Sequence, residues 1–490
     1  MPTPGPSASR ASGAGGAAAT AHPSATRAAV LALRQGGSAV DAAIAAQAVI
    51  CVVMPQAAGL GGDVLALVHD RNGVAAVNGT GLSARDMPSP PGATGATSVT
   101  VPGLVDGWLT LHARWGRLPL ETVLAPAIDL AADGFQLDPS LVTAVSQQRD
   151  RLEQGGASDW SLLSAASRPH DGAWVQPELA VLLQHVAREG RDAFYTGSPA
   201  AAVVDAVRRR GGSLDLVDLV EHATPCPPPL AVEWGGGQVH VQPPMSQGVL
   251  LAMALQKVRS LEAEGNRVDD HLLVEVTEAV FEHRTSCLRG QDLLDVDLAV
   301  DPERTSGRGG PRAYLHTAGV ATADADGQVV SSLVSVFDDF GSGVFVPELG
   351  IVLNNRAAGF TDGDNAAAPG KRPVHTLAPA MVTSPTGVLG IATPGADGQV
   401  QTLLQVLTAT ALTGLPLHEA VGALRWRSQD GDLLLETGHP AREALLARGH
   451  RVVPVTPGAD VFGAVVAAGT HPKPHAVADW RRQSNTQGVA

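Results

Sequence analysis

The sequence has few cysteines, few aromatic residues and no excess of basic residues. Its three cysteines, Cys51, Cys226 and Cys287, are far apart and form no CxxC motif, which excludes a disulfide framework and favours a reducing, cytoplasmic compartment. Basic residues number 34 against 48 acidic ones, and the net charge of −14 argues against nucleic-acid and anionic-membrane partners. Aromatic residues make up only 3% of the chain, yet 490 residues with 44% hydrophobic content suffice for a large core.

Long apolar runs are also missing. The most apolar stretch, Val40 to Met54, contains Asp41 and Gln47 and stops at Pro55, so it predicts a buried helix and no membrane span. The first twenty residues are mostly Pro, Gly, Ser and Ala without an apolar core, so they predict neither a signal peptide nor an anchor. We expect residues 1–20 to form a disordered tail.

Motifs for a cofactor or a metal are absent as well. The Gly-rich stretch 59–63 leads into a strand and no GK[ST] follows, which favours close backbone packing over phosphate binding. The stretch His271 to His283 holds two histidines and three glutamates but no HExxH motif, so we expect a solvated helix face there. The sequence therefore predicts neither a cofactor nor a metal ion.

Helical and strand-like patterns alternate along the chain. The residue spacing predicts helices at 24–35, 249–258 and 399–412, and strands at 64–69, 74–77 and 387–392. Strands and helices mixed in this way indicate layered α+β structure.

One threonine stands where a strand follows an exposed loop. Residues 305–312 are rich in Gly and Arg, and after Thr317 come two alternating runs joined by Asp326-Gly327, a hairpin signature. Cleavage before Thr317 would give it a free α-amino group, which has a reference pKa near 8 and can serve as the base that a weakly nucleophilic hydroxyl needs. The alternative is an ordinary strand residue, because Thr is a favoured strand former.

The stretch from Thr393 to Gly398 is a Gly-containing turn that opens a predicted helix. Such a turn exposes backbone N–H groups, which are the material of an oxyanion hole. The alternative interpretation is a plain helix cap.

Together these segments carry a family resemblance. From about Thr20 onward the chain resembles the gamma-glutamyltransferases, also called gamma-glutamyltranspeptidases. The matching blocks occur in family order: GGSAVDAAIA (36–45), PQAAGLGGD (55–63), VPGLVDGW (101–108), PPMSQG (243–248), HTAGVATADADG (316–327), FGSG (340–343), GIVLNN (350–355) and TPGADG (393–398). The resemblance implies an N-terminal-nucleophile αββα sandwich, made as a proenzyme that cuts itself between His316 and Thr317. The large subunit would be 21–316 and the small one 317–490.

The resemblance also assigns catalytic roles. Thr317 resembles the nucleophile and new N-terminus, and Ser335 replaces a threonine whose hydroxyl supports the nucleophile. Gly395 and Ala396 fall on the Gly-Gly pair whose N–H groups bind the oxyanion, and the Cβ of Ala396 restricts a backbone that glycine would leave free.

The substrate-binding positions depart from the family pattern. They hold Thr80 for an arginine, His375 and Thr376 for two carboxylate-binding serines, Gly359 for an acidic residue, and Phe337 and Arg356 for an asparagine and a glutamine. Charge-assisted partners for the α-carboxylate and α-amino group of glutamate are thus largely lost. The lid at 361–371 also looks short, which would open the site to larger substrates and to water.

These departures suggest the glutathione hydrolase-like or oxamate amidohydrolase-like branch. We expect a self-processing hydrolase or acyltransferase that forms a threonyl acyl-enzyme with a small carboxylate-bearing acyl donor, which need not be gamma-glutamyl. Its substrate would be a small amide, keto-acid or gamma-glutamyl compound, and water or an amine would be the acceptor. One alternative is a C–C hydrolase that removes an oxalyl-type unit, like relatives in antibiotic pathways that build alkylated prolines. The others are a true gamma-glutamyltransferase and a non-catalytic binding protein.

Overall fold

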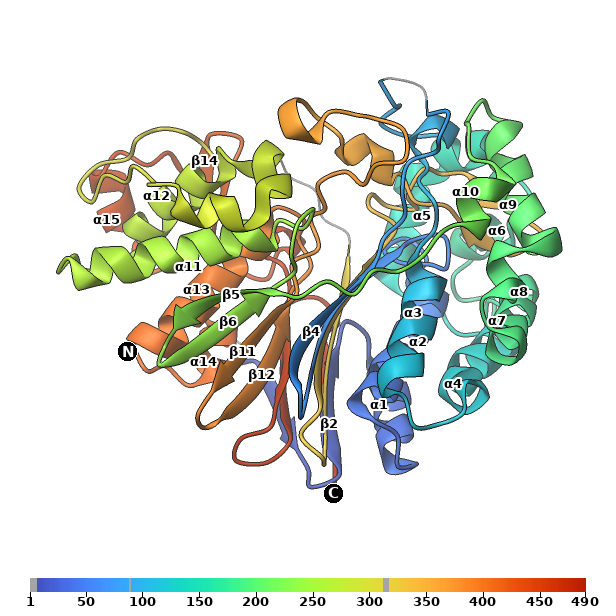
Figure 1. The fold of residues 1–490 in the computed structure, drawn as a ribbon, viewed down its shortest axis with the longest axis horizontal. Coiled ribbons are helices and arrows are strands. Elements are labelled where there is room, and N and C mark those ends of the chain that lie inside the picture. Colours follow the sequence, from blue (N-terminus) through green and yellow to red (C-terminus); the bar gives the residue numbers. More distant parts are fainter. Residues whose placement is uncertain (1–6, 88–89, 312–316) are drawn as a thin grey trace.

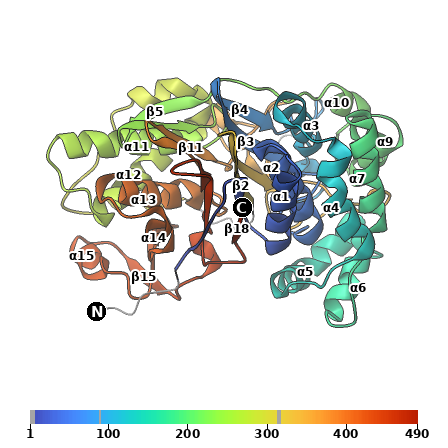
Figure 2. The ribbon, with the colours of Figure 1, turned by 90° about the horizontal axis from the view of Figure 1, so that it is seen from below.

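The computed structural model describes residues 7–87, 90–311 and 317–490. Two sheets pack face to face in the middle of the molecule, and helices cover both outer faces, which gives the four-layered αββα sandwich of the N-terminal-nucleophile hydrolases (Figure 1). Figure 2 shows the same layers from below, with the early helices on one side and the late helices on the other. The predicted fold class is confirmed.

The first sheet has six strands and contains the predicted hairpin. In spatial order its strands are β18 (Asn485–Val489), β2 (Gly16–Thr20), β7 (Ala318–Asp324), β8 (Val329–Ser335), β3 (Asp63–Asp70) and β4 (Gly73–Gly79). All its neighbouring strands pair antiparallel. Strands β7 and β8 lie at its centre and are buried along their whole length. Gly327 in their turn has a φ of 86°, which glycine adopts without strain.

The second sheet has seven strands. In spatial order they are β1 (Ser9–Ser12), β17 (His475–Ala478), β16 (Val466–Gly469), β12 (Gly387–Ala392), β11 (Ala380–Ser384), β6 (Gly237–Val241) and β5 (Leu230–Trp234). Smaller pairings join β9 (Phe345–Val346) to β10 (Ile351–Val352), and β13 (Trp426–Gln429), β14 (Asp432–Glu436) and β15 (Val452–Val455) to one another. Many alanines fill the space between the two large sheets, among them Ala19, Ala321 and Ala468, so the sheets meet through short side chains.

Helices from the first half of the chain lie on the first sheet's side: α1 (Pro23–Arg34), α2 (Ala39–Val53), α3 (Leu104–Trp115), α4 (Leu120–Asp133), α5 (Pro139–Leu152), α6 (Ser161–Ser167), α7 (Pro177–Glu189), α8 (Asp192–Tyr195), α9 (Gly197–Arg208) and α10 (Leu216–Val220). The second sheet's side has α11 (Gly248–Ala263), α12 (Asp270–Phe281), α13 (Gly398–Leu412), α14 (Leu417–Gly422) and α15 (Arg442–Ala447). Helix α2 is the predicted buried helix, and Ser38 with Asp41 forms a capping box at its start. Among the described residues, no helix is long and apolar enough to cross a membrane.

The N-terminal segment corrects one prediction. Residues 1–6 of the predicted disordered tail lie outside the described residues, but residues 9–12 form β1, and residues 16–20 form the fully buried strand β2 between β18 and β7. Alanine and glycine have low strand propensity. Small residues nevertheless fit β2, because neighbouring strands lie close to it. A Cβ on Gly16 would lie 2.8 Å from the carbonyl oxygen of Ala323.

Removal of residues 2–20 should therefore abolish folding. Without β2, both β7 and β18 lose their ladder partner in the interior of the sheet. Soluble yield and thermal unfolding would be compared with a deletion of residues 2–6, which leaves β1 and β2 intact and should behave as the full chain. A 2–20 deletion with an unchanged melting temperature would contradict this role for β2.

Candidate active site

The two hydroxyl groups predicted to cooperate lie side by side at the end of the central hairpin. Thr317 directly precedes β7 and Ser335 ends β8, and the register Ala318 to Val334 places them next to each other. Thr317 Oγ1 and Ser335 Oγ are 3.5 Å apart, and the Ser335 oxygen also accepts the backbone N–H of Phe337 at 2.9 Å. Both residues are buried. His316, the other side of the predicted cut, lies outside the described residues.

The predicted oxyanion turn lies between β12 and α13. Gly395 and Ala396 have φ values of 126° and 48°, so both occupy the left-handed region, which is strained for alanine. Within the described residues, neither backbone N–H is donated to a partner. Arg427 Nη1 donates to the Gly395 carbonyl at 3.2 Å, and because N–H and C=O of a trans peptide point in opposite directions, the Ala396 N–H is directed away from Arg427.

Packing between the two sheets brings this turn towards Thr317. A Cβ built on Gly319, two residues after Thr317, would lie 3.8 Å from the Cβ of Ala392, the last residue of β12. Gln247 fixes the turn from the other side, since its Nε2 donates to the carbonyls of Thr376 at 2.6 Å and Ala396 at 2.8 Å. The beginning of β7 and the end of β12 therefore meet at one place.

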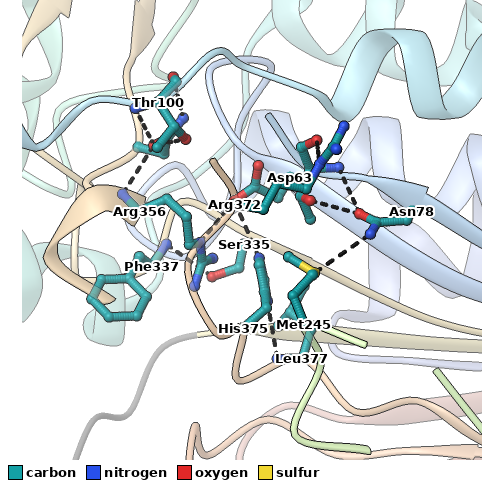
Figure 3. Close-up of polar contacts among 12 residues, drawn as sticks. Asp63, Asn78, Thr100, Met245, Ser335, Phe337, Arg356, Arg372, His375 and Leu377 are labelled. Atoms are coloured by element: carbon teal, nitrogen blue, oxygen red, sulfur yellow. Dashed lines mark hydrogen bonds and ion pairs between the residues drawn. The ribbon is translucent and has the colours of Figure 1, made fainter. Parts of the chain in front are cut away.

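A buried charge cluster lies beside the hydroxyl pair (Figure 3). Asp63 opens β3 directly opposite Ser335 in the ladder, and Arg356 Nε donates to Asp63 Oδ2 at 2.9 Å. His375 Nε2 lies 3.4 Å from the same oxygen. The Leu377 backbone N–H donates to His375 Nδ1 at 3.1 Å, so Nε2 carries the proton and donates to Asp63. The structure thus joins two predicted substrate-binding residues through a carboxylate.

Burial sets the protonation states in this cluster. It lowers the pKa of His375 to about 4, so the imidazole is neutral near pH 7. Burial by itself raises the pKa of Asp63, but the Arg356 charge and the His375 hydrogen bond outweigh it and lower that pKa below its usual value. Burial also lowers the pKa of Arg356, although a guanidinium remains charged in proteins.

The ion pair leaves hydrogen-bonding capacity unused. Arg356 Nη1 and Nη2 and Asp63 Oδ1 are buried without a hydrogen-bond partner among the described residues. Each such group costs roughly 1–3 kcal/mol of stability, and more when it is charged. Native proteins contain few such groups, and they concentrate where a function requires them.

The remaining predicted binding residues make their contacts with neighbouring protein groups. Thr80 is fully buried and its Oγ1 donates to Asn78 Oδ1 at 2.6 Å. Thr376 is buried and its carbonyl accepts from Gln247. Phe337 has a φ of 87°, and its ring centroid lies 4.5 Å from the Arg356 guanidinium carbon. A Cβ on Gly359 would be a tight fit, because it would lie 3.3 Å from the Val374 carbonyl oxygen.

Phe337 and Gly359 line an open pocket of about 690 Å³. Its wall also includes Asp397 from the turn before α13, two residues of α12, three residues of the segment that follows α12, and residues of the Gly-rich loop that precedes the predicted cut. Segment 361–371, which the sequence predicts to be a short lid, lies beside it, and its Asn365 donates to the Gly359 carbonyl at 2.8 Å and accepts from the Val374 N–H at 2.7 Å. Phe337, whose ring contacts Arg356, links this pocket to the charge cluster.

Sequence reasoning missed three residues of this region. Asp63 ends the PQAAGLGGD block, yet only its glycines drew an interpretation. Arg372 follows segment 361–371, and its Nε donates to the Thr80 carbonyl at 2.9 Å. Its guanidinium group therefore lies beside Thr80, the position where the family pattern has an arginine. Gln247, in the PPMSQG block, fixes the turn. Two features of the sequence could have indicated two of these residues. An acidic residue directly follows the glycines of 59–62, and a basic pair, Lys371-Arg372, stands shortly before the predicted substrate-binding position His375.

Helix α12 contradicts the prediction of a solvated face. Its residues His271, Glu275 and Glu278 are buried, and His271, Glu275 and His450 place their ligand atoms within 4.8 Å of one another. However, His271 Nδ1 and His450 Nε2 are 2.7 Å apart and share a hydrogen bond, and Glu275 accepts from the Ser306 N–H and hydroxyl. Two nitrogens on one tetrahedral zinc with bonds of about 2.0–2.1 Å must lie farther apart. The cluster satisfies its own hydrogen bonds.

The buried His375 predicts a pH-dependent stability. Its folded pKa, about 4, lies below the unfolded value near 6.5, so the unfolded state takes up the proton first as pH falls. Its contribution is fully present above pH 6.5 and is lost towards pH 4, about 2 kcal/mol between pH 7 and pH 5. Denaturant unfolding at both pH values should show a smaller loss for His375→Asn than for the wild type or for His170→Asn, an exposed control. An equal loss in all three proteins would contradict a buried, neutral His375.

Comparison with known proteins shows the family to which the chain belongs. A family model described as gamma-glutamyltranspeptidase matches residues 25–489. The chain is 31% identical to the oxamate amidohydrolase proenzyme of Klebsiella pneumoniae, covering 93% of this chain and 95% of that one. It is 30% identical to the acylase ACY 1 proenzyme of Pseudomonas sp. strain SE83, covering 90% and 88%.

Among solved structures, the chain is similar to the cephalosporin acylase from Bacillus halodurans, with a TM-score of 0.85 and 26% identity over 100% of this chain and 98% of that one. The family model covers nearly the whole chain, and these relatives are enzymes with hydrolase and acylase names. The chain belongs to the gamma-glutamyltranspeptidase family of N-terminal-nucleophile hydrolases.

Proposed function

We propose that this protein is a self-processing amide hydrolase or acyltransferase in which Thr317 is the nucleophile and small carboxylate-bearing acyl groups are the donors. The observation that carries the proposal is the Thr317 and Ser335 hydroxyl pair, 3.5 Å apart at the end of the central hairpin. The beginning of β7 there faces the end of β12, from which the Gly395–Ala396 turn follows.

Cleavage before Thr317 supplies the missing base. The freed α-amino group takes the proton from Thr317 Oγ1 as that oxygen attacks the acyl carbonyl. The carbonyl oxygen then carries negative charge, and the undonated N–H groups of Gly395 and Ala396 are suited to bind it. The amine leaves with a proton, and water or another amine releases the acyl group from Thr317. Ser335 Oγ orients the nucleophile through the same contact that the uncut chain shows.

The substrate class follows from what surrounds the hydroxyl pair. A free glutamyl group would bring an α-ammonium to a site where Gly359 offers no charge and His375 is neutral. A carboxylate, in contrast, meets Arg356 and Arg372, whose pKa values fall through burial but which stay charged. The printed names of the relatives, oxamate amidohydrolase, acylase and cephalosporin acylase, are compatible with acyl donors other than gamma-glutamyl.

The first prediction is autocleavage between His316 and Thr317. A denaturing gel should show fragments of 316 and 174 residues, and Thr317→Ala should stay as one chain, because it lacks the attacking oxygen. Thr322→Ala, in the strand β7 that directly follows Thr317, is the control that should still be cut. A wild type that stays intact and is nonetheless active would refute the N-terminal-nucleophile mechanism.

The second prediction concerns Ser335. Ser335→Ala should slow both processing and turnover by roughly 10- to 1,000-fold, because it removes a hydroxyl that orients Thr317. Ser331→Ala is a matched control: it is buried on the same strand and face, but its hydroxyl donates to the Ile391 carbonyl at 2.8 Å, so it should affect stability only. Equal rates for the wild type and Ser335→Ala would show that this hydroxyl does not assist Thr317.

The third prediction concerns the donor. Glutathione should be a poor substrate, and transfer to dipeptides should be weaker than hydrolysis, because at Gly359 the α-ammonium loses water without gaining the acidic partner that the family pattern has at this position. A glutaryl or oxalyl-type donor without the amino group should have the higher kcat/KM. Steady-state kinetics on the processed protein decides this, and a strong preference for glutathione would overturn the proposed substrate class.

A further inference from the structure

Arg356 has a fully buried guanidinium group that uses only one of its side-chain nitrogens. Nε donates to Asp63 Oδ2 at 2.9 Å, whereas Nη1 and Nη2 have no hydrogen-bond partner among the described residues. The residue is also fixed at its backbone, where its N–H donates to Asn354 Oδ1 at 3.0 Å. Nη1 and Nη2 are therefore charged donors that are held in place without an acceptor among the described residues. This arrangement is expected of a site that a ligand completes.

The position of this guanidinium relates it to the reaction. Asp63, its ion-pair partner, lies opposite Ser335 in the β3–β8 ladder, and Ser335 Oγ is 3.5 Å from Thr317 Oγ1. Arg356 is thus connected to the proposed nucleophile through two neighbouring side chains. A group bound at Nη1 and Nη2 would belong to the acyl part of a donor whose carbonyl reaches Thr317.

Phe337 covers the guanidinium. Its ring centroid lies 4.5 Å from the Arg356 guanidinium carbon, and the same residue lines the 690 Å³ pocket, which Arg356 itself does not reach. Its φ of 87° is rare for a bulky residue and is typical of strain stored at functional sites. Because the Phe337 N–H donates to Ser335 Oγ, the backbone stays fixed when the ring rotates about χ1.

The charges around Asp63 favour an anion. Arg356 is ion-paired with Asp63, and Arg372 lies near enough for the Asp63 charge to counteract the fall of its pKa on burial. His375, the third neighbour, is neutral near pH 7. Asp63 thus faces two guanidinium groups, while a second carboxylate, Asp338, also acts on Arg356 and accepts from Asn355 Nδ2 at 2.7 Å. What favours a carboxylate ligand here is therefore the pair of charged donors Nη1 and Nη2, which have no acceptor among the described residues.

We propose that Arg356 binds the free carboxylate of the acyl donor through Nη1 and Nη2, and that the Phe337 ring covers this site until the donor displaces it. This inference rests on the proposed function and names the carboxylate-binding residue of that site. It predicts that the enzyme selects acyl donors for a carboxylate, because a planar guanidinium with two parallel N–H groups matches carboxylate geometry.

The test compares two donors that differ only in charge: a glutaryl anilide and its neutral carboxamide analogue. The wild type should prefer the carboxylate. Arg356→Lys should reduce this preference at least about tenfold, because lysine keeps the charge for Asp63 but cannot donate two parallel hydrogen bonds. Phe337→Leu should raise the ratio of kcat/KM for the carboxylate donor to kcat/KM for the neutral donor roughly three- to thirty-fold, because it removes the ring's contact with the cation.

Phe360→Leu is the matched control. Phe360 is also buried and has a cation, Lys371, 5.9 Å from its ring, but it does not line the pocket, so neither donor's kcat/KM should change. Phe337→Leu keeps the Arg356–Asp63 ion pair, so it remains decisive if the lysine variant does not fold.

Two results would overturn the inference: an unchanged preference in Arg356→Lys, or an equal loss of kcat/KM for both donors in Phe337→Leu. In either case normal processing before Thr317 and hydrolysis of the neutral donor would leave the proposed function standing. A processed wild type that cleaves neither donor would refute the proposed function, and the inference with it.

Discussion

The pairing of β7 with β8 at the centre of the first sheet is the constraint on which the site depends. It places Thr317 and Ser335 at one end of a fully buried ladder, where neither side chain can move far. Strand β3 adds Asp63 to the same end, and through Asp63 the positions of Arg356 and His375 are fixed. The hydrophobic layer between the sheets keeps this end facing β12 and the turn that follows it.

The site is also where the backbone departs from ordinary conformations. Of the six non-glycine residues with a positive φ among the described residues, three lie here: Phe337, Ala396 and Met245, whose carbonyl accepts the His375 N–H at 2.7 Å. Left-handed backbone at such residues costs of order 1–3 kcal/mol each and persists only where the surroundings enforce it. Unpaired polar atoms on Arg356 and Asp63 add to this local cost. The fold's large core tolerates both, and together they indicate a region selected for binding and chemistry over stability.

Much of the fold could be predicted from the sequence because strong local signals agreed with it. The Asp326-Gly327 turn and the capping residue Ser38 produced the expected hairpin and helix. Residues 16–20 were mispredicted because an Ala- and Gly-rich stretch has no periodicity to show, and its strand exists only through its two neighbours. The buried face of α12 was also missed, because glutamates in a sequence are typical of a solvated surface. In the structure two of them are buried and accept hydrogen bonds from Ser306 and Ser428.

For the site, sequence motifs indicated the predicted nucleophile, its supporting hydroxyl and the turn, but not the partners. Nothing in the spacing of Asp63, Arg356 and His375 shows that they meet, because the contacts span about three hundred residues of chain. Arg372 could not be paired with Thr80 for the same reason.

The most direct test of the account is intact-mass spectrometry of the processed protein, quenched during turnover of a slow glutaryl donor. The account predicts that the fragment beginning at Thr317 gains the mass of one glutaryl group, that its unmodified N-terminus is Thr317, and that the large fragment stays unmodified. Acyl mass on the large fragment, or turnover by a chain with no new N-terminus at Thr317, would contradict it.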